Sequence, residues 1–301
     1  MASTAGSPHD CVRIALAEDL GCRDLDVVHD VTGVLAVPPG ARGRARLVAK
    51  SRGVLAGVDC AVAAFRMLDA GVSIDVKCGD GGRFEPGQSV LEVAGDMHAL
   101  LAAERTALNF VQRLSGIASL TRAFVDAVAG TGAQILDTRK TTPGLRQLEK
   151  AAVRAGGGHN HRFGLFDQVL LKENHFAFAR PLGHEEVVRR CVAGHARPVV
   201  AEARTLAEAL AVVLGGAAVV LLDNFAPGPQ LCEAVEAVRE TAAGLGRSVL
   251  TEASGGVGLA SVRAYAECGV DRISIGALTH SAPAADLSLL VEGTVLVEGA
   301  E

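Results

Sequence analysis

The sequence predicts an α/β fold whose second half is organised around a parallel sheet. From residue 134 onward, short apolar segments alternate with helical segments six times. This alternation is typical of βα units joined by right-handed crossovers, in a sheet that is closed as a barrel or open and doubly wound. Residues 40–97 instead alternate apolar and polar residues and contain a Pro-Gly turn, which predicts an antiparallel sheet in an α+β segment. At 301 residues the chain is long enough for two domains, or for a barrel with an appendage.

The elements of the first half follow from local periodicity. Strands are expected at residues 44–50, 72–77 and 87–94, with helices at 8–20 and 56–68. Residues 97–130 carry apolar side chains at steps of three to four, which predicts a long amphipathic helix. Gly116 is expected to divide that helix in two.

The second half is expected to contain six strands and the helices between them. The strands are expected at residues 134–136, 168–171, 198–201, 218–222, 248–250 and 272–275. The helices are expected at residues 145–155, 185–193, 206–214, 229–243 and 259–268. Residues 291–301 have no evident partner and are expected to form a tail.

Charge and composition exclude several classes of partner. The net charge is −5 and only ten residues are aromatic, nine Phe and one Tyr, so neither a polyanion-binding surface nor base-stacking platforms are expected. We therefore expect no nucleic-acid partner. The longest apolar stretch, residues 209–222, is too short to cross a bilayer, and the first ten residues lack the pattern of an export signal.

The cysteines indicate a reducing compartment. There are seven, an odd number, and no two form a C-x-x-C pair. The sequence therefore predicts reduced thiols in the cytoplasm, with neither a disulfide framework nor a zinc ribbon.

Polar or glycine-rich residues follow every expected strand of the second half. Because the carboxyl ends of parallel strands form the active-site face of α/β folds, these residues should meet. They are Asp137 to Lys140, Lys172 to His175, Glu202, Asp223 and Asn224, Glu252 to Gly256, and Gly276 with Ala277. Between Arg139 and His175, seven basic residues stand against three acidic ones, which predicts a small anionic ligand. Within that window, Lys150 and Arg154 are expected to be solvated helix-surface charges.

Three interpretations of these strand ends concern phosphate and metal. The Ser254-Gly255-Gly256 and Gly276-Ala277 loops match the way late barrel strands bind phosphate through backbone N–H groups. Glu202 and Asp223 could hold one Mg²⁺ together with substrate oxygens. Alternatively, the two carboxylates pair with Arg139 or Lys172 as a buried ion network. A transition-metal site at His159, His161 and His175 is disfavoured by Arg162, and His161 is expected to donate to a carboxylate instead.

Several motifs together resemble one known family. They are Asp137 to Arg146, Gly156 to Arg162, Leu171 to His175, Ala103 to Thr106, Leu222 to Asn224, Glu252 to Gly256 and Gly276 to Ser281. The combination resembles quinolinate phosphoribosyltransferase (nicotinate-nucleotide pyrophosphorylase, carboxylating). The resemblance implies an incomplete, TIM-like α/β barrel at residues 116–277, preceded by an α/β sandwich domain at 1–115 that the segment 278–301 can join. It implies formation of nicotinate mononucleotide, pyrophosphate and CO₂ from quinolinate and phosphoribosyl pyrophosphate, with Mg²⁺, in de novo NAD biosynthesis.

The resemblance also implies roles for individual residues. Quinolinate is expected to contact Arg105, Arg139, His161, Arg162 and Lys172, and Thr138 is expected to bind substrate. The phosphoribosyl side is expected to contact Lys140, Glu202 and Asp223, the last two as Mg²⁺ ligands, and the loop residues Ser254, Gly255, Gly256, Ile275, Gly276 and Ala277. An obligate homodimer is implied, in which Arg105 enters the neighbouring subunit's site.

The sequence departs from the family pattern at two places, and other functions compete. Arg204 stands where the family often has a second acid after Glu202, so fewer acidic side chains are expected around the metal. Residues 21–26 replace the usual N-terminal motif.

The competing functions are a Schiff-base aldolase using Lys172, an anion sensor without turnover, and a relative that uses nicotinate.

Overall fold

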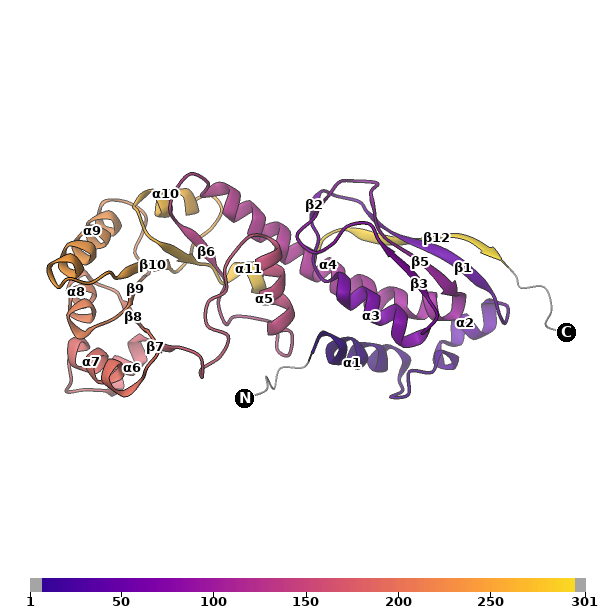
Figure 1. Cartoon of the computed structure of the whole chain (residues 1–301), viewed down its shortest axis with the longest axis horizontal. Helices are drawn as coiled ribbons and strands as arrows, with labels where there is room; N and C mark the ends of the chain where they lie inside the picture. Colours follow the sequence, from indigo (N-terminus) through magenta and orange to yellow (C-terminus); the bar gives the residue numbers. More distant parts are fainter. Residues whose placement is uncertain (1–6, 296–301) are drawn as a thin grey trace. The chain divides into compact units, whose positions relative to one another are not determined.

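The computed structural model describes residues 7–295, which fold into two compact units (Figure 1). The first unit comprises the chain up to Arg122, Thr141–Gly157 and the chain from Thr279 onward. The second comprises Ala123–Lys140 and Gly158–Leu278. The domain boundary expected after residue 115 falls inside helix α4, Met97–Ala127, and remains a prediction.

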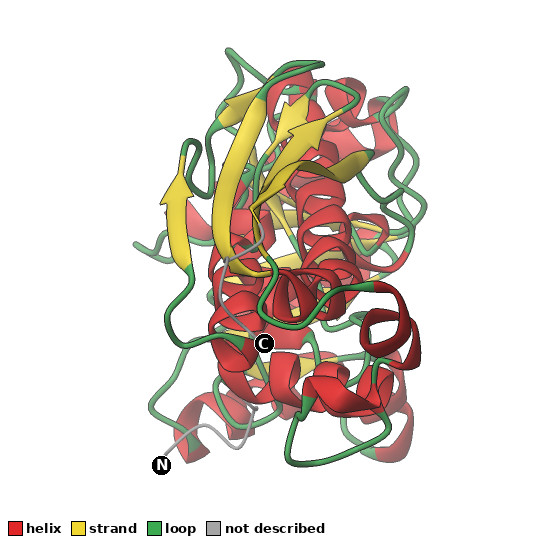
Figure 2. Cartoon of the chain, turned by 90° about the vertical axis from the view of Figure 1, so that its right-hand side faces the viewer, coloured by secondary structure: helices red, strands yellow, loops and turns green. Residues whose placement is uncertain are grey.

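The first unit is built on a four-stranded antiparallel sheet, whose strand order is β12-β1-β5-β3. Its strands are β1 Arg42–Ala49, β3 Ser73–Val76, β5 Ser89–Asp96 and β12 Leu287–Val295. The short strands β2 Gly53–Val54 and β4 Arg83–Phe84 form a separate pair. The unit's helices before α4 are α1 Pro8–Leu20, η1 Val27–His29, α2 Val31–Ala36 and α3 Val58–Leu68. Figure 1 shows α3 and α4 along one face of the sheet, and Figure 2 separates the strands from the helices.

Strand β12 corrects the expectation of a C-terminal tail. Residues 287–295 pair with the whole of β1, from Leu287 opposite Ala49 to Val295 opposite Arg42. The local pattern did not predict it because a strand at the edge of a sheet is specified by its partner, which lies more than two hundred positions earlier. Residues 296–301 of the expected tail lie outside the described residues.

Gly116 does not break the long helix, contrary to the expectation. Helix α4 runs without interruption from Met97 to Ala127. A Cβ at position 116 would collide with the carbonyl oxygen of Pro283. The glycine therefore permits a close approach of two backbones instead of ending the helix.

The second unit is built on a six-stranded sheet in the order β6-β11-β10-β9-β8-β7, and its neighbouring strands pair in parallel. The strands are β6 Gln134–Leu136, β7 Val169–Leu171, β8 Val199–Ala203, β9 Val219–Asp223, β10 Leu250–Ser254 and β11 Arg272–Ser274. In Figure 1 the sheet curves, with its helices on the outer side. They include α6 Glu173–Phe178, α7 His184–Gly194, α8 Leu206–Gly215, α9 Pro229–Gly244 and α10 Val262–Glu267. Strands β6 and β7 are the two edges, so the barrel is incomplete.

Two elements of this sheet differ from the expectation in a way that matters for the site. Strand β10 begins at Leu250 and ends at Ser254, so Glu252 lies inside the strand and not in the loop after it. The expected strand at 248–250 was too early because apolar content alone marked it. Helix α6, which begins directly after Lys172, was not expected.

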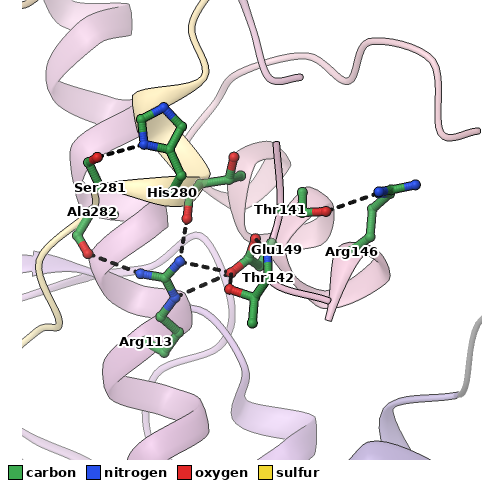
Figure 3. A network of polar contacts seen from close by, with 9 residues as sticks. Arg113, Thr141, Thr142, Arg146, Glu149, His280, Ser281 and Ala282 are labelled. Atoms are coloured by element: carbon green, nitrogen blue, oxygen red, sulfur yellow. Dashed lines mark hydrogen bonds and ion pairs between the residues drawn. The ribbon is translucent and has the colours of Figure 1, made fainter. Parts of the chain in front are cut away.

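A polar network in the first unit fixes helix α5, Arg146–Ala155 (Figure 3). The fully buried Glu149 carboxylate accepts hydrogen bonds from Arg113 Nη2 at 2.9 Å and from the Thr142 hydroxyl at 2.7 Å. Arg113 also donates to the carbonyl oxygens of Thr279 and Ala282. The expectation that Lys150 is solvated is wrong, because it is buried on this helix, whereas Arg154 is exposed as expected.

The cysteine expectation is also corrected. Cys232 on α9 and Cys268 after α10 are joined in a disulfide, which the sequence could not predict because the two residues are brought together only by the packing of their helices.

Among the described residues, no helix combines the length and apolar character needed to cross a membrane.

Candidate active site

The inward face of the second sheet has an apolar base. Buried Val200, Val219 and Leu221 pack with Leu170 and Leu250. Side chains two positions further along a strand lie on the same face. Two positions after Leu170, Val200, Leu221 and Leu250, toward the carboxyl ends of the strands, the sequence therefore has Lys172, Glu202, Asp223 and Glu252. Charged side chains thus gather immediately above the apolar base.

The β6 side of the site is held by a buried carboxylate. Asp137, at the end of β6, has no exposed surface and accepts hydrogen bonds from Asn160 Nδ2 at 2.6 Å and from the His161 backbone N–H at 2.8 Å. His159 pairs with β6 as well, donating its N–H to the Ile135 carbonyl at 2.8 Å. The segment that carries His161 and Arg162 therefore lies alongside β6 like a short extra strand.

Two arginines form the cationic part of the site. Arg139 follows β6, and Arg162 follows the segment paired with it. Burial lowers the pKa of Arg162, and the neighbouring charge of Arg139 lowers it further. Arg162 Nη1 donates to the Gln168 carbonyl at 3.2 Å, but its buried Nε has no acceptor among the described residues. Like charges held together with a buried donor unused favour an anionic ligand.

Two carboxylates form the acidic part. Burial raises the pKa of Glu202, and the charge of Asp223 raises it further. The pKa of Asp223 is also raised by burial, against the charges of Lys172, Arg204 and Lys140, which lower it. Glu202 accepts a weak hydrogen bond from the Glu173 backbone N–H at 3.3 Å and lies 3.8 Å from Lys172 Nζ. The ion pair with Lys172 that the sequence left open is present as a loose contact.

The glycine loops border the acidic part. The Asn224 N–H donates to the Ser254 carbonyl at 2.9 Å, which joins the ends of β9 and β10. Gly255 has φ +101°, and a Cβ there would collide with the Asn224 side chain, so only glycine fits. Gly256 is exposed beside it. After β11, the Ile275 N–H donates to the Leu136 carbonyl at 2.9 Å, which places Gly276 and Ala277 next to the end of β6.

The remaining predicted residues are placed as follows. Thr138 follows Asp137 and accepts a hydrogen bond from the Lys140 N–H at 3.0 Å, so it shapes the loop that carries Arg139 and Lys140. Arg105 lies on α4 in the first unit, with 71% of its side chain exposed, 3.4 Å from Glu104. Every other predicted site residue belongs to the second unit. His161 and Arg162 lie on the segment paired with β6, and the others lie at the carboxyl ends of strands.

Two further predicted features, His175 and Arg204, have partners of their own in the structure. His175 accepts a hydrogen bond from the Lys172 N–H at 2.8 Å, so it caps α6. No group of three or more metal-ligating side chains occurs within residues 7–295. Arg204 pairs with Glu173 at 2.7 Å and so compensates an acid next to Glu202.

Comparison with known proteins then decides the family. Residues 117–290 match the family model of the quinolinate phosphoribosyl transferase C-terminal domain, and residues 29–115 match that of its N-terminal domain. A nicotinate-nucleotide pyrophosphorylase [carboxylating] of Mycobacterium leprae is 42% identical over 287 residues, covering 93% of this chain and 95% of that protein. The chain belongs to the quinolinate phosphoribosyl transferase family.

Further relatives agree with this assignment. A quinolinate phosphoribosyltransferase [decarboxylating] of Nicotiana glauca is 36% identical over 304 residues, covering 95% of this chain and 83% of that protein. The solved structure of the nicotinate-nucleotide pyrophosphorylase from Francisella tularensis superimposes with a TM-score of 0.84 at 34% identity, covering 97% of this chain and 100% of that one. The incomplete barrel with an N-terminal sheet domain is therefore the family fold.

The acidic pair fits the Mg²⁺ that the family resemblance implies. Mg²⁺ prefers oxygen ligands and binds through one or two carboxylates together with substrate phosphates. Glu202 and Asp223 supply two such groups on adjacent strands, and burial raises the pKa of both, with the charge of Asp223 raising that of Glu202 further. A divalent cation would relieve that repulsion.

Sequence reasoning assigned no role to several residues that shape this family site. Asp137 holds the His161 segment, Glu173 contacts Glu202 through its N–H, and Glu252 lies buried next to His161. Asp137 and Glu252 both belong to motifs quoted for the resemblance. The available signal was an acid placed inside or at the end of an otherwise apolar strand, which requires a specific partner when buried.

Proposed function

We propose that the protein transfers the phosphoribosyl group of phosphoribosyl pyrophosphate to quinolinate, with decarboxylation, giving nicotinate mononucleotide, pyrophosphate and CO₂ for de novo NAD biosynthesis. The observation that carries this proposal is the division of the site into two oppositely charged parts. Arg139 and Arg162 form the cationic part, and Glu202 and Asp223 the acidic part, at the same end of one sheet. Such a site suits two ligands of different charge requirements.

The cationic part suits the pyridine dicarboxylate. Guanidinium groups bind carboxylates through paired N–H donors, which Lys cannot reproduce. Arg139 and Arg162 are proposed to hold the two carboxylates, with Lys172 and Thr138 completing the pocket. A dicarboxylate also offsets the repulsion that lowers the pKa of Arg162. A ligand with one carboxylate would offset less of the repulsion between Arg139 and Arg162.

The acidic part suits the ribose centre. As the bond to pyrophosphate breaks, C1 of the ribose becomes cationic, and nearby carboxylates stabilise it. Lys140 is proposed to neutralise the departing pyrophosphate, and the backbone N–H groups of the two glycine loops to hold the 5-phosphate. Bound Mg²⁺, held by Glu202 and Asp223, supplies further positive charge for the pyrophosphate.

Decarboxylation then needs no organic cofactor. The pyridine nitrogen forms the bond to C1, and the resulting pyridinium accepts the electron pair left when the 2-carboxylate departs as CO₂. A proton added at that carbon completes nicotinate mononucleotide. The protein's part is to hold the ring and to exclude alternative positions of the carboxylates.

Assembly and location are further proposals. We propose a homodimer in which Arg105 completes the neighbouring subunit's site, which its exposed position on α4 allows. We propose that the enzyme acts in the cytoplasm, and its partners are taken to be small molecules, neither nucleic acid nor membrane.

One assay tests the proposal against its rivals. The purified protein is incubated with quinolinate labelled in the 2-carboxylate, phosphoribosyl pyrophosphate and Mg²⁺, and labelled CO₂ and nicotinate mononucleotide are measured. We expect both products, and a kcat/KM for nicotinate lower by at least about 100-fold, since a single carboxylate leaves a polar site built for two carboxylates partly unsatisfied. Quinolinate binding without CO₂ would identify an anion sensor, and comparable use of nicotinate would identify a nicotinate-using enzyme. Borohydride trapping of a carbonyl substrate on Lys172 would identify an aldolase.

A further inference from the structure

Glu252 is a fully buried carboxylate that the proposed chemistry does not use. It lies inside β10, two residues before Ser254, with no exposed surface. Neither of its carboxylate oxygens has a hydrogen-bond partner among the described residues. Burying an ionisable group without a partner is costly, so such a group requires a specific neighbour. That neighbour is His161, whose Nε2 lies 3.3 Å from Glu252 Oε1.

The other contacts of His161 determine which way its ring faces. Its Nδ1 accepts a hydrogen bond from the Arg162 backbone N–H at 2.8 Å. In a neutral imidazole whose Nδ1 is an acceptor, the proton resides on Nε2, the nitrogen that faces Glu252. The distance suits an ion pair or a hydrogen bond, and a small rotation of the ring would align the N–H with the carboxylate. The carboxylate that His161 faces is therefore Glu252.

The same histidine is linked to the cationic part of the site. The bond between His161 Nδ1 and the Arg162 N–H fixes the backbone from which the Arg162 side chain extends. The Arg162 guanidinium retains a buried Nε without an acceptor in the described part of the chain. A change in the angle of the His161 ring would therefore move the group that is available to the anion.

We propose that Glu252 is a positioning residue that sets the His161 ring and, through it, places Arg162 for the pyridine dicarboxylate. The proposal rests on the function proposed above for its consequence in turnover, but the contact between Glu252 and His161 is independent of it. Glu252 touches no reacting atom in this arrangement. Its effect is on binding of the dicarboxylate, while the phosphoribosyl side of the site is held by other strands.

Two substitutions separate this role from a purely structural one. Glu252→Gln keeps an oxygen acceptor for His161, whereas Glu252→Leu keeps the volume and removes the acceptor. We expect Glu252→Leu to raise KM for quinolinate by at least about tenfold, the effect of losing one hydrogen bond to a charged group, with KM for phosphoribosyl pyrophosphate changed less than about twofold. We expect Glu252→Gln to restore most of the quinolinate affinity. Equal rises in both KM values, or a folded Glu252→Leu protein with unchanged KM values, would overturn the proposal.

Glu149→Gln is the matched control, because it also alters a fully buried glutamate but lies in the first unit with its own hydrogen-bond partners. We expect it to lower stability without changing the ratio of the two KM values. A shift in that ratio as large as that of Glu252→Leu would mean that general destabilisation produces the effect, and would overturn the proposal.

A measurement without substrate tests the contact itself. In proton NMR of the whole protein, the His161 Nε2–H should give a downfield resonance, identified by its loss in His161→Gln. We expect the resonance to move upfield in Glu252→Leu and to persist in Glu252→Gln. If it is unchanged in Glu252→Leu, the contact is absent and the proposal fails, whatever the activity. If it behaves as expected but the wild-type protein releases no CO₂, the proposed function fails and the contact stands.

A double-mutant cycle completes the test. If Glu252 acts through His161, the Glu252→Leu/His161→Gln protein should bind quinolinate no more weakly than the weaker single variant. Losses that multiply would show that Glu252 acts independently of His161, and would overturn the proposal.

Discussion

Glu149 and Glu252 are both fully buried glutamates, one in each unit, and their surroundings differ completely. The Glu149 carboxylate accepts four hydrogen bonds, two from Arg113 and two from Thr142 (Figure 3). The Glu252 carboxylate accepts none among the described residues and faces only His161. A saturated buried charge stabilises a packing arrangement, whereas an unsaturated one is retained where a site needs it. On this contrast we base the structural role assigned to Glu149 and the positioning role proposed for Glu252.

Two arginines on helix α4 show the same contrast. Arg113 is mostly buried and donates to Glu149, Thr279 and Ala282. Arg105, two turns earlier on the same helix, is 71% exposed and lies 3.4 Å from Glu104. The first holds three segments of its own unit together. The second is exposed, as the proposed shared site requires.

The largest expected effect tests that reading of Arg105. Arg105→Ala and Lys172→Ala should each be nearly inactive, since each removes a cation from every dicarboxylate site. When the two variants are refolded together in equal amounts, about half of the dimers are mixed, and each mixed dimer has one intact site, so activity should return to about a quarter of wild type. The measurement is CO₂ release before and after co-refolding.

Its control is the formation of mixed dimers, shown with two affinity tags of different kinds. If Arg105 serves its own chain, every site in the mixture lacks one residue and no activity returns. A mixture that contains mixed dimers but releases no CO₂ would therefore reject the shared site and remove the contrast with Arg113.

The second effect is on stability and concerns Glu149. Replacing it with Gln leaves the buried part of Arg113 without its counterion, which should lower the free energy of unfolding by about 3 kcal/mol. Urea denaturation at pH 7 measures this. The matched control is Glu185→Gln on the surface of α7, where Glu185 pairs with exposed Arg189, and no measurable change is expected. If both variants lose the same stability, the saturated network in Figure 3 has no special role.

Local rules predicted much of the fold. Helix α1 was predicted at its observed bounds, and the structure shows local signals at both ends: Ser7 caps it, Pro8 begins it and Gly21 follows it. Strand β6 was also predicted at its bounds, since a short apolar segment between glycine-rich and polar residues is a strong local signal. Strand β12 and the continuity of α4 through Gly116 were missed, because each depends on a distant segment: β1 in the first case and Pro283 in the second.

The sequence predicted which residues lie together in the site, but it did not predict which residues position the others. Arg139, Glu202 and Asp223 were found because they follow apolar strands of a parallel sheet, whose ends must coincide. Arg162 was found from the family resemblance. Glu252 was expected in a loop, and it lies ninety-one positions after His161, which it contacts. In the sheet, β6 and β11 lie between β10, which carries Glu252, and the segment that carries His161. No local pattern reports such a pairing. The burial of Lys150 was missed for the same reason, since solvation of a helical lysine depends on what packs against it.

The smallest expected effect has the opposite sign from that at Glu149, and it concerns Asp223. Its pKa is raised by burial, with the charge of Glu173 adding to the rise, and Asp223 in turn raises the pKa of Glu202. A carboxyl whose pKa is raised by folding destabilises the folded protein above that pKa and gains stability as the pH falls through it. Asp223→Asn should therefore stabilise the ligand-free protein at pH 7, by less than about 1 kcal/mol because solvent screens a partly exposed group.

The pH dependence and the metal response make this last prediction specific. The stabilisation should disappear as the pH falls toward the ordinary range of carboxyl pKa values, where wild-type Asp223 is protonated and resembles Asn. Adding Mg²⁺ should raise the unfolding temperature of the wild type and have a smaller effect on the variant, since one of the two proposed ligands is gone. Unfolding temperatures measured across pH, with and without Mg²⁺, read out both effects. If Asp223→Asn instead destabilises the protein at pH 7, as Glu149→Gln is expected to do, then Asp223 is a structural acid, and the division between the saturated and unsaturated regions does not extend to the acidic pair.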